Sequence, residues 1–591
     1  MMNVFNLGEV VMVWQAVPIF VFLTGLTVLW ARTVCFKTTV EAVSTSPATV
    51  ALFGRAGSAK RFGYDFHAYV FEPKSPAASI KSNLLWLIAF TFGLELMVNY
   101  DTWGHGEVTS YFNGMLAHSP LVLVMTLATL AFMWAALLYA DPSEAGVSAS
   151  TLMLVGTVLF FMLVLIESNN FIALYVALEG MSLLLFVLTA QPKTAVSVES
   201  GLKYFFQSSF ASILLLLGIA LVFAGVQDFD FVGIRWVMLS EPLTPVVTIG
   251  FFLITIALLF KISAFPGHFW APDVYRGPAA SVLTVFAVVV KLAAFFVLFN
   301  VFNQFLSVIY VHFSSILYVS AAVSMLLGAL GAVRVINEAG SRRQFIAYTS
   351  INQVGFVRLG LVCVSVEGFW ASFIYLRVYL LSSVLFLGVL SRVRISTKDG
   401  LRNLTRLDEL RRVFNSDSTF SRRTDLFIVA YAVWSMAGLP PLAGFFGKVA
   451  LWSALLHKMD ALVSGEAWAE VVYSFRFVDA SLELDPFVGF GSILALSIVV
   501  SIISGVYYFK LYELMSPSAS NAEMLRYVES RSVYMMQDRA TIGTTVVLVI
   551  LLASWFGMIC WSGWSTPFVF PATLLDTTWG AWTSQLDGYL W

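Results

Sequence analysis

Residues 260–275, Phe-Lys-Ile-Ser-Ala-Phe-Pro-Gly-His-Phe-Trp-Ala-Pro-Asp-Val-Tyr, end an apolar run that begins near Val246. They place Lys261, and then the helix-breaking pair Pro266-Gly267, at membrane depth. A charged side chain in hydrocarbon costs about 2.5 to 3.5 kcal/mol on insertion scales, so Lys261 is expected to face protein or a watery cavity. A broken helix leaves backbone groups that only protein or water can satisfy. The stretch therefore predicts a polar pocket near the middle of a membrane.

The composition is that of a polytopic membrane protein, because 59% of the 591 residues are hydrophobic and only 12% are charged. The three cysteines, Cys35, Cys363 and Cys560, stand far apart and show no CxxC or Cys/His spacing. This pattern predicts no disulfide framework, no metal or iron–sulfur site and no cofactor held by this chain.

Apolar runs of roughly 18 to 25 residues, the length that crosses a bilayer, predict fourteen spans. They are expected at 9–31, 82–100, 118–140, 149–166, 170–190, 202–225, 246–270, 279–302, 313–335, 344–363, 368–391, 426–456, 487–511 and 541–563.

Basic residues in the loops predict the topology. With the N-terminus outside, nearly all loop Lys and Arg residues fall on the inner side, and both termini lie outside. The polar insertion 32–81 and the basic connector 392–425 are then on the inner side. Residues 512–540 are expected to begin as an amphipathic helix along that surface.

Charged residues inside spans are candidates for function. A second break, residues 438–447, ends beside Lys448, as the first break follows Lys261. Two interrupted hydrophobic segments in corresponding halves are typical of repeat-built transporters. Desolvation penalises a buried ammonium group and a nearby carboxylate offsets that penalty, so lysines with a movable carboxylate partner would form a proton relay. The basic residues within spans are Lys203, Lys261, Lys291, Arg358, Arg377 and Lys448, and the clearest acids are Glu95 and Glu179.

At these residues the chain resembles subunit 2 of mitochondrial NADH:ubiquinone oxidoreductase, which is called subunit N in bacterial complex I. The resemblance runs from about Glu95 to Lys510. The motifs that carry it are Lys261 to Gly277, Leu178-Glu179-Gly-Met-Ser-Leu, the stretch from Lys203 to Ser212, Lys291 ten residues into its span, Arg343 to Gly355, and Gly438 to Lys448.

The resemblance implies an all-α polytopic membrane protein of fourteen helices with two inverted five-helix repeats, each with a broken helix. The implied divisions are N-terminal helices with an insertion (1–148), the first repeat (149–302), the second repeat (313–511), and a surface segment with the last span and tail (512–591).

The family's function implies a proton-translocating membrane-arm subunit of complex I, driven by quinone reduction elsewhere and without a redox centre of its own. Residues matching the family's relay are Glu179 and Lys261 as the ion pair, Lys291 as the central relay, Lys448 in the second half-channel, and Lys203 and His268 as supporting groups. Lys203 begins its span, so the alternative that it only reaches toward the inner interface stays open.

The chain departs from the family pattern at Arg358 and Arg377, in the insertion 32–81 and in the tail beyond Ser562. Arg358 lies near the outer end of its span and is expected to reach the interface, whereas Arg377 lies deeper and needs a partner. Two alternatives remain: a subunit of a multisubunit cation/proton antiporter, and a subunit that keeps the fold without pumping.

The resemblance implies as partners the other membrane subunits of complex I, including the adjacent antiporter-like ones, and membrane lipids, but no nucleic acid. Phe and Trp are abundant and His is scarce, a bias common in organelle genomes. The expected location is therefore the mitochondrial inner membrane, or the bacterial plasma membrane if the source is prokaryotic.

Overall fold

The computed structural model describes residues 18–19, 21–30, 76–98, 109–140, 147–240, 244–338, 340–363, 365–392, 394–397, 400–403, 406–407, 420–463 and 486–515. Within these ranges a helix occupies every expected span. The expected spans at 9–31, in large part, and at 541–563 lie outside the described residues, as do most of the insertion 32–81 and the segment 516–540.

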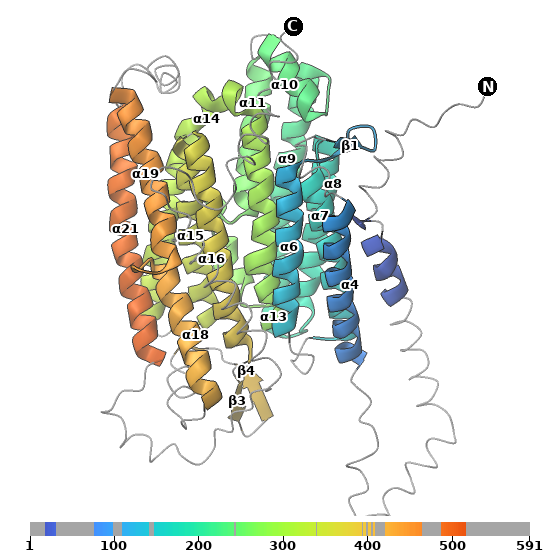
Figure 1. The fold of residues 1–591 in the computed structure, drawn as a ribbon, viewed down its shortest axis with the longest axis vertical. Coiled ribbons are helices and arrows are strands. Elements are labelled where there is room, and N and C mark those ends of the chain that lie inside the picture. Colours follow the sequence, from blue (N-terminus) through green and yellow to red (C-terminus); the bar gives the residue numbers. More distant parts are fainter. Residues whose placement is uncertain are drawn as a thin grey trace, which may run out of the picture.

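The described chain is a bundle of helices (Figure 1). Nine helical stretches in the described residues are long and apolar enough to cross a membrane. Two of them share the long helix α14, because Ala280–Phe302 ends in it and Ser315–Asn337 lies within it. The elements that build the bundle are α4 (Pro76–Val98), α6 (Pro120–Tyr139), α7 (Ala149–Glu167), α8 (Phe171–Ala190), α9 (Ala195–Val226), α10 (Phe231–Ser240), α11 (Pro245–Lys261), α12 (Trp270–Val274), α13 (Ala280–Thr284), η3 (Val285–Val289), α14 (Val290–Asn337), α15 (Arg342–Cys363), α16 (Val366–Arg392), α18 (Phe420–Ala437), α19 (Ala443–Val463) and α21 (Pro486–Met515).

Short polar residues start several of these helices where the sequence leaves an apolar run. Ser119 accepts a hydrogen bond from the Val122 N–H, and Pro120 follows it at the first helical position of α6. Ser148 and Thr151 form a reciprocal capping box at the start of α7. Such caps satisfy N–H groups that have no partner inside the helix, so they fix where each span begins.

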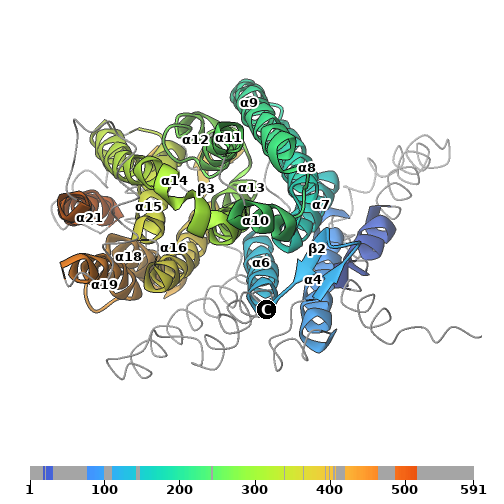
Figure 2. The ribbon, with the colours of Figure 1, turned by 90° about the horizontal axis from the view of Figure 1, so that it is seen from above.

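Seen from above, the helices form two groups that meet near α13 (Figure 2). One group holds α4, α6, α7 and α8, and the other holds α14, α15, α16, α18, α19 and α21, while α9, α11 and α12 lie along one side. The span Ala280–Phe302, made of α13, η3 and the start of α14, is buried on all sides. A helix that is apolar all round belongs in such a central position.

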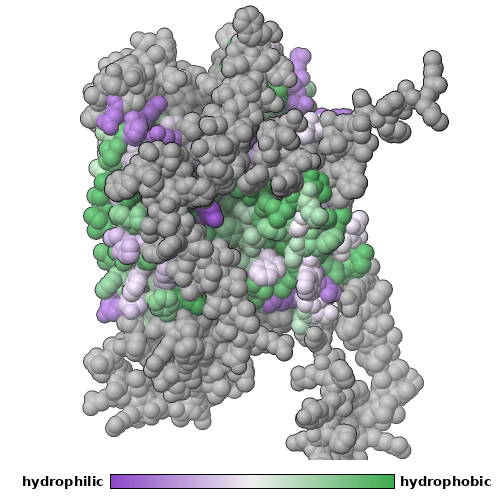
Figure 3. All heavy atoms as spheres, in the orientation of Figure 1, coloured by the Kyte–Doolittle hydropathy of each residue, from purple (hydrophilic) through white to green (hydrophobic). Residues whose placement is uncertain are grey.

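On the face shown in Figure 3, most of the described residues in the middle of the bundle are hydrophobic, and most hydrophilic ones lie toward its two ends. Helix α9 illustrates this arrangement, because Phe206, Phe210 and Ile213 are exposed on one face while Ser208 and Ser212 are buried on the other. The exposed apolar face suits contact with lipid, and the buried hydroxyls point into the protein.

Two hairpins that the span pattern did not predict lie at opposite ends of the bundle (Figure 1). Strands β1 (Thr109–Tyr111) and β2 (Leu116–His118) pair antiparallel, and Phe112, Asn113 and Gly114 turn with positive φ. Strands β3 (Arg394–Thr397) and β4 (Gly400–Asn403) pair within the basic connector. The strands are too short to show a clear alternation of apolar and polar residues, so the sequence did not predict them.

Candidate functional site

The first broken helix separates α11 from α12. At the end of α11 the Phe260 carbonyl loses its helical partner and accepts a hydrogen bond from Trp270 Nε1 at 2.9 Å. Ser263 has a φ of 59°, in the left-handed region that a non-glycine residue adopts at a cost. At Gly267 a Cβ would lie 2.4 Å from the Phe260 ring, so only glycine lets the loop pack against it. The expected break is confirmed, and protein groups satisfy part of it.

Lys261 ends α11 and points its ammonium group at helix α9. Its Nζ donates to Ser208 Oγ at 2.8 Å and to Ser212 Oγ at 3.2 Å. The two serines are four residues apart and therefore share one face of α9. A small cavity adjoins the lysine and is lined by Tyr204, Ser208, Phe260, Lys261 and Trp270. A small cavity therefore adjoins Lys261, and its lining combines polar side chains with the aromatic rings of Phe260 and Trp270.

Glu179, in α8, reaches the same serine from the other side. Ser212 Oγ donates to Glu179 Oε2 at 2.5 Å while it accepts from the Lys261 ammonium group. No direct ion pair between Glu179 and Lys261 occurs within the described residues. The carboxylate and the ammonium group are thus joined through one shared hydroxyl.

Lys291 follows a π-helical turn, η3, at the start of α14. The side chain is buried, and Nζ has no hydrogen-bond partner in the described part of the chain. It lies 5.9 Å from the centre of the Tyr275 ring, within the range of a cation–π contact. Single π turns inside α-helices are frequent at functional sites, and this one precedes the lysine expected at the centre of the relay.

Lys448, in α19, lies beside the second broken helix. Its Nζ donates to the Ala437 carbonyl at 2.7 Å, to Ser501 Oγ at 2.9 Å and to Ser504 Oγ at 3.4 Å. The Ala437 carbonyl belongs to the last residue of α18, where a helix leaves carbonyls without partners. The face of the Phe356 ring lies 5.0 Å from Nζ. The second break therefore also holds a lysine, and here the lysine is fully buried.

The glycine that opens this second break has a clear structural task. Gly438 has a φ of 80°, and a Cβ there would lie 2.9 Å from Lys448 Cδ. A side chain would therefore strain the backbone and push the lysine away from the Ala437 carbonyl.

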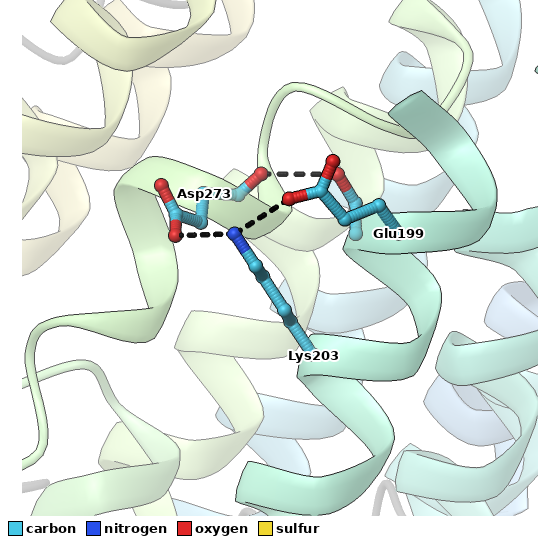
Figure 4. Close-up of polar contacts among 4 residues, drawn as sticks. Glu199, Lys203 and Asp273 are labelled. Atoms are coloured by element: carbon cyan, nitrogen blue, oxygen red, sulfur yellow. Dashed lines mark hydrogen bonds and ion pairs between the residues drawn. The ribbon is translucent and has the colours of Figure 1, made fainter. Parts of the chain in front are cut away.

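Lys203 lies between two carboxylates (Figure 4). Its Nζ is 2.8 Å from Glu199 Oε1, one turn earlier in α9, and 3.0 Å from Asp273 Oδ2 in α12. Ser200 Oγ donates to the Asp273 backbone carbonyl, which ties α9 to α12 a second time. The side chain is 42% exposed, so Lys203 belongs to a peripheral cluster and not to the buried group at Lys261.

His268 is half-buried in the first break, with its ring about 6.0 Å from the rings of Phe265 and Phe269. Its Nδ1 is buried without a hydrogen-bond partner in the described part of the chain. The supporting role that the resemblance implies for His268 stays a prediction.

A buried polar network that the sequence reading missed lies next to the second break. Gln353 Nε2 donates to the Met436 carbonyl at 3.1 Å and to the Tyr508 hydroxyl at 3.4 Å, and Tyr375 donates to Gln353 Oε1. Asn352 Nδ2 donates to the Tyr507 hydroxyl at 2.9 Å. The available signal was the Asn-Gln pair in the middle of an expected span.

The two arginines that depart from the family pattern have different surroundings. The expectation that Arg358 reaches the outer interface is wrong, because its side chain is fully buried and bonded to Ser320 and Ser324 of α14. Arg377 is exposed on α16 and has no hydrogen bond or ion pair within the described residues. The partner that Arg377 needs at this depth stays a prediction.

Within the described residues no cluster of His, Cys, Asp and Glu could hold a metal ion. The groups that the site brings together are proton donors and acceptors: two lysines beside broken helices, a third in a central helix, one carboxylate, and serine hydroxyls. Serines were missed as a group because nothing in a span pattern separates a hydroxyl that bonds its own helix from one that faces a lysine.

Broken helices at two places in one helical bundle, each with a lysine beside the break, define a membrane ion-translocating protein of the antiporter-like class. A family model described as the NADH:quinone oxidoreductase/Mrp antiporter transmembrane family matches residues 168–467. The chain belongs to this family, and the antiporter-like fold class expected from the sequence is confirmed.

Two curated relatives are bacterial NADH-quinone oxidoreductase subunits N. The chain is similar to subunit N 1 of Acidiphilium cryptum, with 32% identity over 356 residues that cover 60% of this chain and 66% of that one. It is 30% identical to subunit N of Jannaschia sp. over 386 residues, which cover 62% of this chain and 76% of the relative.

A solved structure shows the same fold at lower identity. A chain of respiratory complex I from Thermus thermophilus, solved with bound aureothin, matches with a TM-score of 0.60 and 23% identity. The match covers 81% of this chain and 92% of that chain.

Proposed function

We propose that this chain is the proton-translocating membrane subunit of an NADH:quinone oxidoreductase, equivalent to subunit N. One observation carries the proposal: the Ser212 hydroxyl links the Lys261 ammonium group to the Glu179 carboxylate beside a broken membrane helix. Family membership and the identity to bacterial subunits N support it. The chain contributes proton movement to the complex and no redox centre of its own.

The shared hydroxyl offers a proton transfer that separates no charge. Lys261 gives a proton to Ser212 Oγ as the hydroxyl proton moves to Glu179, so one N–H bond and one O–H bond break and two O–H bonds form. The charged pair becomes a neutral amine and a neutral carboxylic acid. Neither state leaves a single uncompensated charge, which would be costly in a low-dielectric site. Two states of similar energy are what a switchable relay requires.

The remaining relay residues take the roles that follow from their places. Lys291, buried in the central span, passes protons between the two broken helices, and Lys448 serves the second half-channel. Lys203 and His268 support the first half, Lys203 through its two carboxylates. Neighbouring antiporter-like subunits and lipids of the membrane are the expected partners, since the subunit N relatives belong to a multisubunit oxidoreductase.

The runner-up is a subunit of a stand-alone cation/proton antiporter, which the family description also includes. The identity of about one third to named subunits N favours the oxidoreductase. Co-purification of the chain with NADH dehydrogenase activity separates the two functions. The relatives described are bacterial, which favours the bacterial plasma membrane over the mitochondrial inner membrane.

Glu179→Gln tests the proposal in the assembled complex in inverted vesicles. The amide cannot accept the proton from Ser212 and restore a neutral pair, so we expect proton uptake and NADH:quinone turnover to fall by at least about tenfold, since a positioned proton acceptor contributes roughly 10²–10⁴-fold. Glu179→Asp keeps the carboxylate and should be milder.

The matched control is Glu338→Gln, an acid-to-amide change at an exposed site where the carboxylate pairs with Arg334. NADH oxidation by the detergent-solubilised complex with an artificial acceptor, together with native gels, checks that each variant complex is assembled. Normal pumping by a fully assembled Glu179→Gln complex would contradict the proposal.

A further inference from the structure

Arg358, in α15, is a buried cation that the proton relay does not use. Its Nη2 donates to the Ser320 carbonyl at 2.8 Å and to Ser324 Oγ at 2.6 Å, and its Nη1 donates to Ser320 Oγ. Its Nε reaches the Val354 carbonyl of its own helix at 3.4 Å. Every partner of Arg358 within the described residues is a neutral oxygen. A charge held this way in a protein interior is costly, so the arrangement needs a reason.

Ser324 carries the contact beyond helix α14. Its hydroxyl donates to the Ser320 carbonyl at 2.6 Å and accepts from Arg358 Nη2 and from the Phe265 backbone N–H at 2.9 Å. A hydroxyl has one donor and two acceptor positions, so all of its capacity is used. Removing it would leave Phe265 and Arg358 each short of a hydrogen bond.

Phe265 lies in the first broken helix, four residues after Lys261. Its N–H has left the helical ladder of α11, which ends at Lys261. A free N–H at membrane depth needs a protein or water partner, and here Ser324 is that partner. The loop that follows Lys261 is therefore fastened to a helix outside its own half of the bundle.

Helix α15 also borders the second broken helix. Phe356, two residues before Arg358, places its ring 5.0 Å from Lys448 Nζ. Gln353, one turn further back, bonds the Met436 carbonyl next to the end of α18. One helix therefore touches the surroundings of Lys448 on one part of its surface and, through Arg358 and Ser324, the loop behind Lys261.

We propose that Arg358 is a positioning residue that fastens the first broken helix through Ser324 and so mechanically connects the Lys261 site with the Lys448 site. The link holds the loop 262–269, and with it the end of α11, so that Lys261 stays within reach of Ser208 and Ser212. A shift of α15 at Lys448 is passed to the loop by the same bonds. The inference rests on the proposed proton-translocating function, but the link itself is measurable without it.

Ser324→Ala, Ser324→Thr and Arg358→Met in the assembled complex test the link, with Ser382→Ala as the matched control. Ser382 is a fully buried serine whose hydroxyl bonds, among the described residues, only carbonyls of its own helix, α16. The first readout is amide hydrogen exchange of a peptide covering 260–270. We expect exchange to become about threefold to tenfold faster in Ser324→Ala and Arg358→Met, the factor that one hydrogen bond of ordinary strength controls. Ser324→Thr and Ser382→Ala should exchange like the unmodified complex.

The second readout is the number of protons taken up per NADH oxidised in inverted vesicles. We expect this ratio to fall at least twofold in Ser324→Ala and to return with Ser324→Thr, because threonine restores the hydroxyl. Unchanged exchange in Ser324→Ala would overturn the link, and faster exchange with an unchanged proton ratio would overturn the positioning role. If the complex with Arg358→Met does not assemble, the comparison of Ser324→Ala with Ser324→Thr still tests the link between α14 and the loop.

The two proposals fail in different ways. Normal pumping in Glu179→Gln together with faster exchange in Ser324→Ala would contradict the proton relay and leave the link standing. Impaired pumping in Glu179→Gln with unchanged exchange in Ser324→Ala would contradict the link and leave the proton relay standing.

Discussion

The two broken helices hold their lysines in different ways. Lys261 is half-buried, adjoins a small cavity and is joined to the Glu179 carboxylate through Ser212. Lys448 is fully buried, and its partners among the described residues are a carbonyl, two hydroxyls and the face of an aromatic ring. Lys261 is thus connected to an acid through one hydroxyl group, whereas the partners of Lys448 in the described part of the chain are all neutral groups.

This difference assigns different tasks to the two sites. At the first site a proton can move between two groups with no change in net charge. At the second site each protonation adds a full charge, which the Ala437 carbonyl, the hydroxyls and the ring stabilise only in part. The second lysine therefore depends on a charge arriving or leaving nearby. Under the proposed function, the first site acts as a local switch and the second responds to its neighbours.

The largest effect is expected from removing either lysine. Lys261→Ala and Lys448→Ala should each reduce proton uptake in inverted vesicles by at least about tenfold, because each deletes a proton carrier from a linear path. Assembly should separate them. Lys261→Ala leaves the Glu179 carboxylate without its cation, whereas Lys448→Ala leaves hydroxyls and a carbonyl that can bond one another.

Native-gel yields of the complex measure this second part of the prediction. A lower yield for Lys261→Ala than for Lys448→Ala agrees with the asymmetry. Equal pumping losses with a lower yield for Lys448→Ala would contradict the prediction that assembly depends more on Lys261 than on Lys448.

A carboxylate can be supplied to the second site to make it resemble the first. Ser501 Oγ lies 2.9 Å from Lys448 Nζ, so Ser501→Asp would place an acid in direct contact with the ammonium group. A fixed ion pair of this kind holds the lysine charged, and we expect proton uptake to slow several-fold. Ser501→Asn is the matched control, since it has the same shape without the charge. Faster pumping in Ser501→Asp than in Ser501→Asn would show that the neutral surroundings of Lys448 are not required.

A smaller effect is expected from the hydroxyl that joins the first pair. Ser212→Ala removes the shared proton donor but leaves Ser208 as a partner for Lys261 and leaves both charges in place. We expect a partial loss of proton uptake, smaller than in Glu179→Gln, and recovery in Ser212→Thr. Ser208→Ala should be milder still, because Ser208 contacts the lysine and not the carboxylate. Equal activity of Ser212→Ala and the unmodified complex would exclude the hydroxyl as the bridge.

Hydropathy and the Pro-Gly pairs could predict the spans, the two breaks and the lysines beside them, because each is a local property of the chain. The resemblance added Glu179, Lys291 and Lys448 as members of one relay. What local sequence could not supply was which neutral groups meet each charge. Ser212, 33 residues from Glu179 and 49 from Lys261, meets both only after three helices pack together.

Arg358 is a second residue whose surroundings the local sequence could not predict. Its place near the end of a span suggested a side chain that reaches the interface, as long basic side chains often do. Two serines one turn apart on α14 instead give it partners inside the protein. The choice between interface and interior depends on which helix packs beside the arginine, and that is a tertiary property.

The smallest effect is expected at Lys203, where the charges are exposed and numerous. Its Nζ has two carboxylate partners, Glu199 and Asp273, at a partly exposed site, so solvent already stabilises each charge. Ion pairs of this kind contribute little to stability and are screened by salt. We therefore expect Asp273→Asn to leave assembly unchanged and to lower proton uptake only slightly, with the difference disappearing as the salt concentration rises. Lys203→Gln should behave in the same way if the cluster only guides protons toward the first broken helix. A salt-independent loss as large as that of Lys261→Ala would instead place Lys203 on the obligatory proton path. The charged site at the first broken helix would then extend from Lys261 to the edge of the bundle.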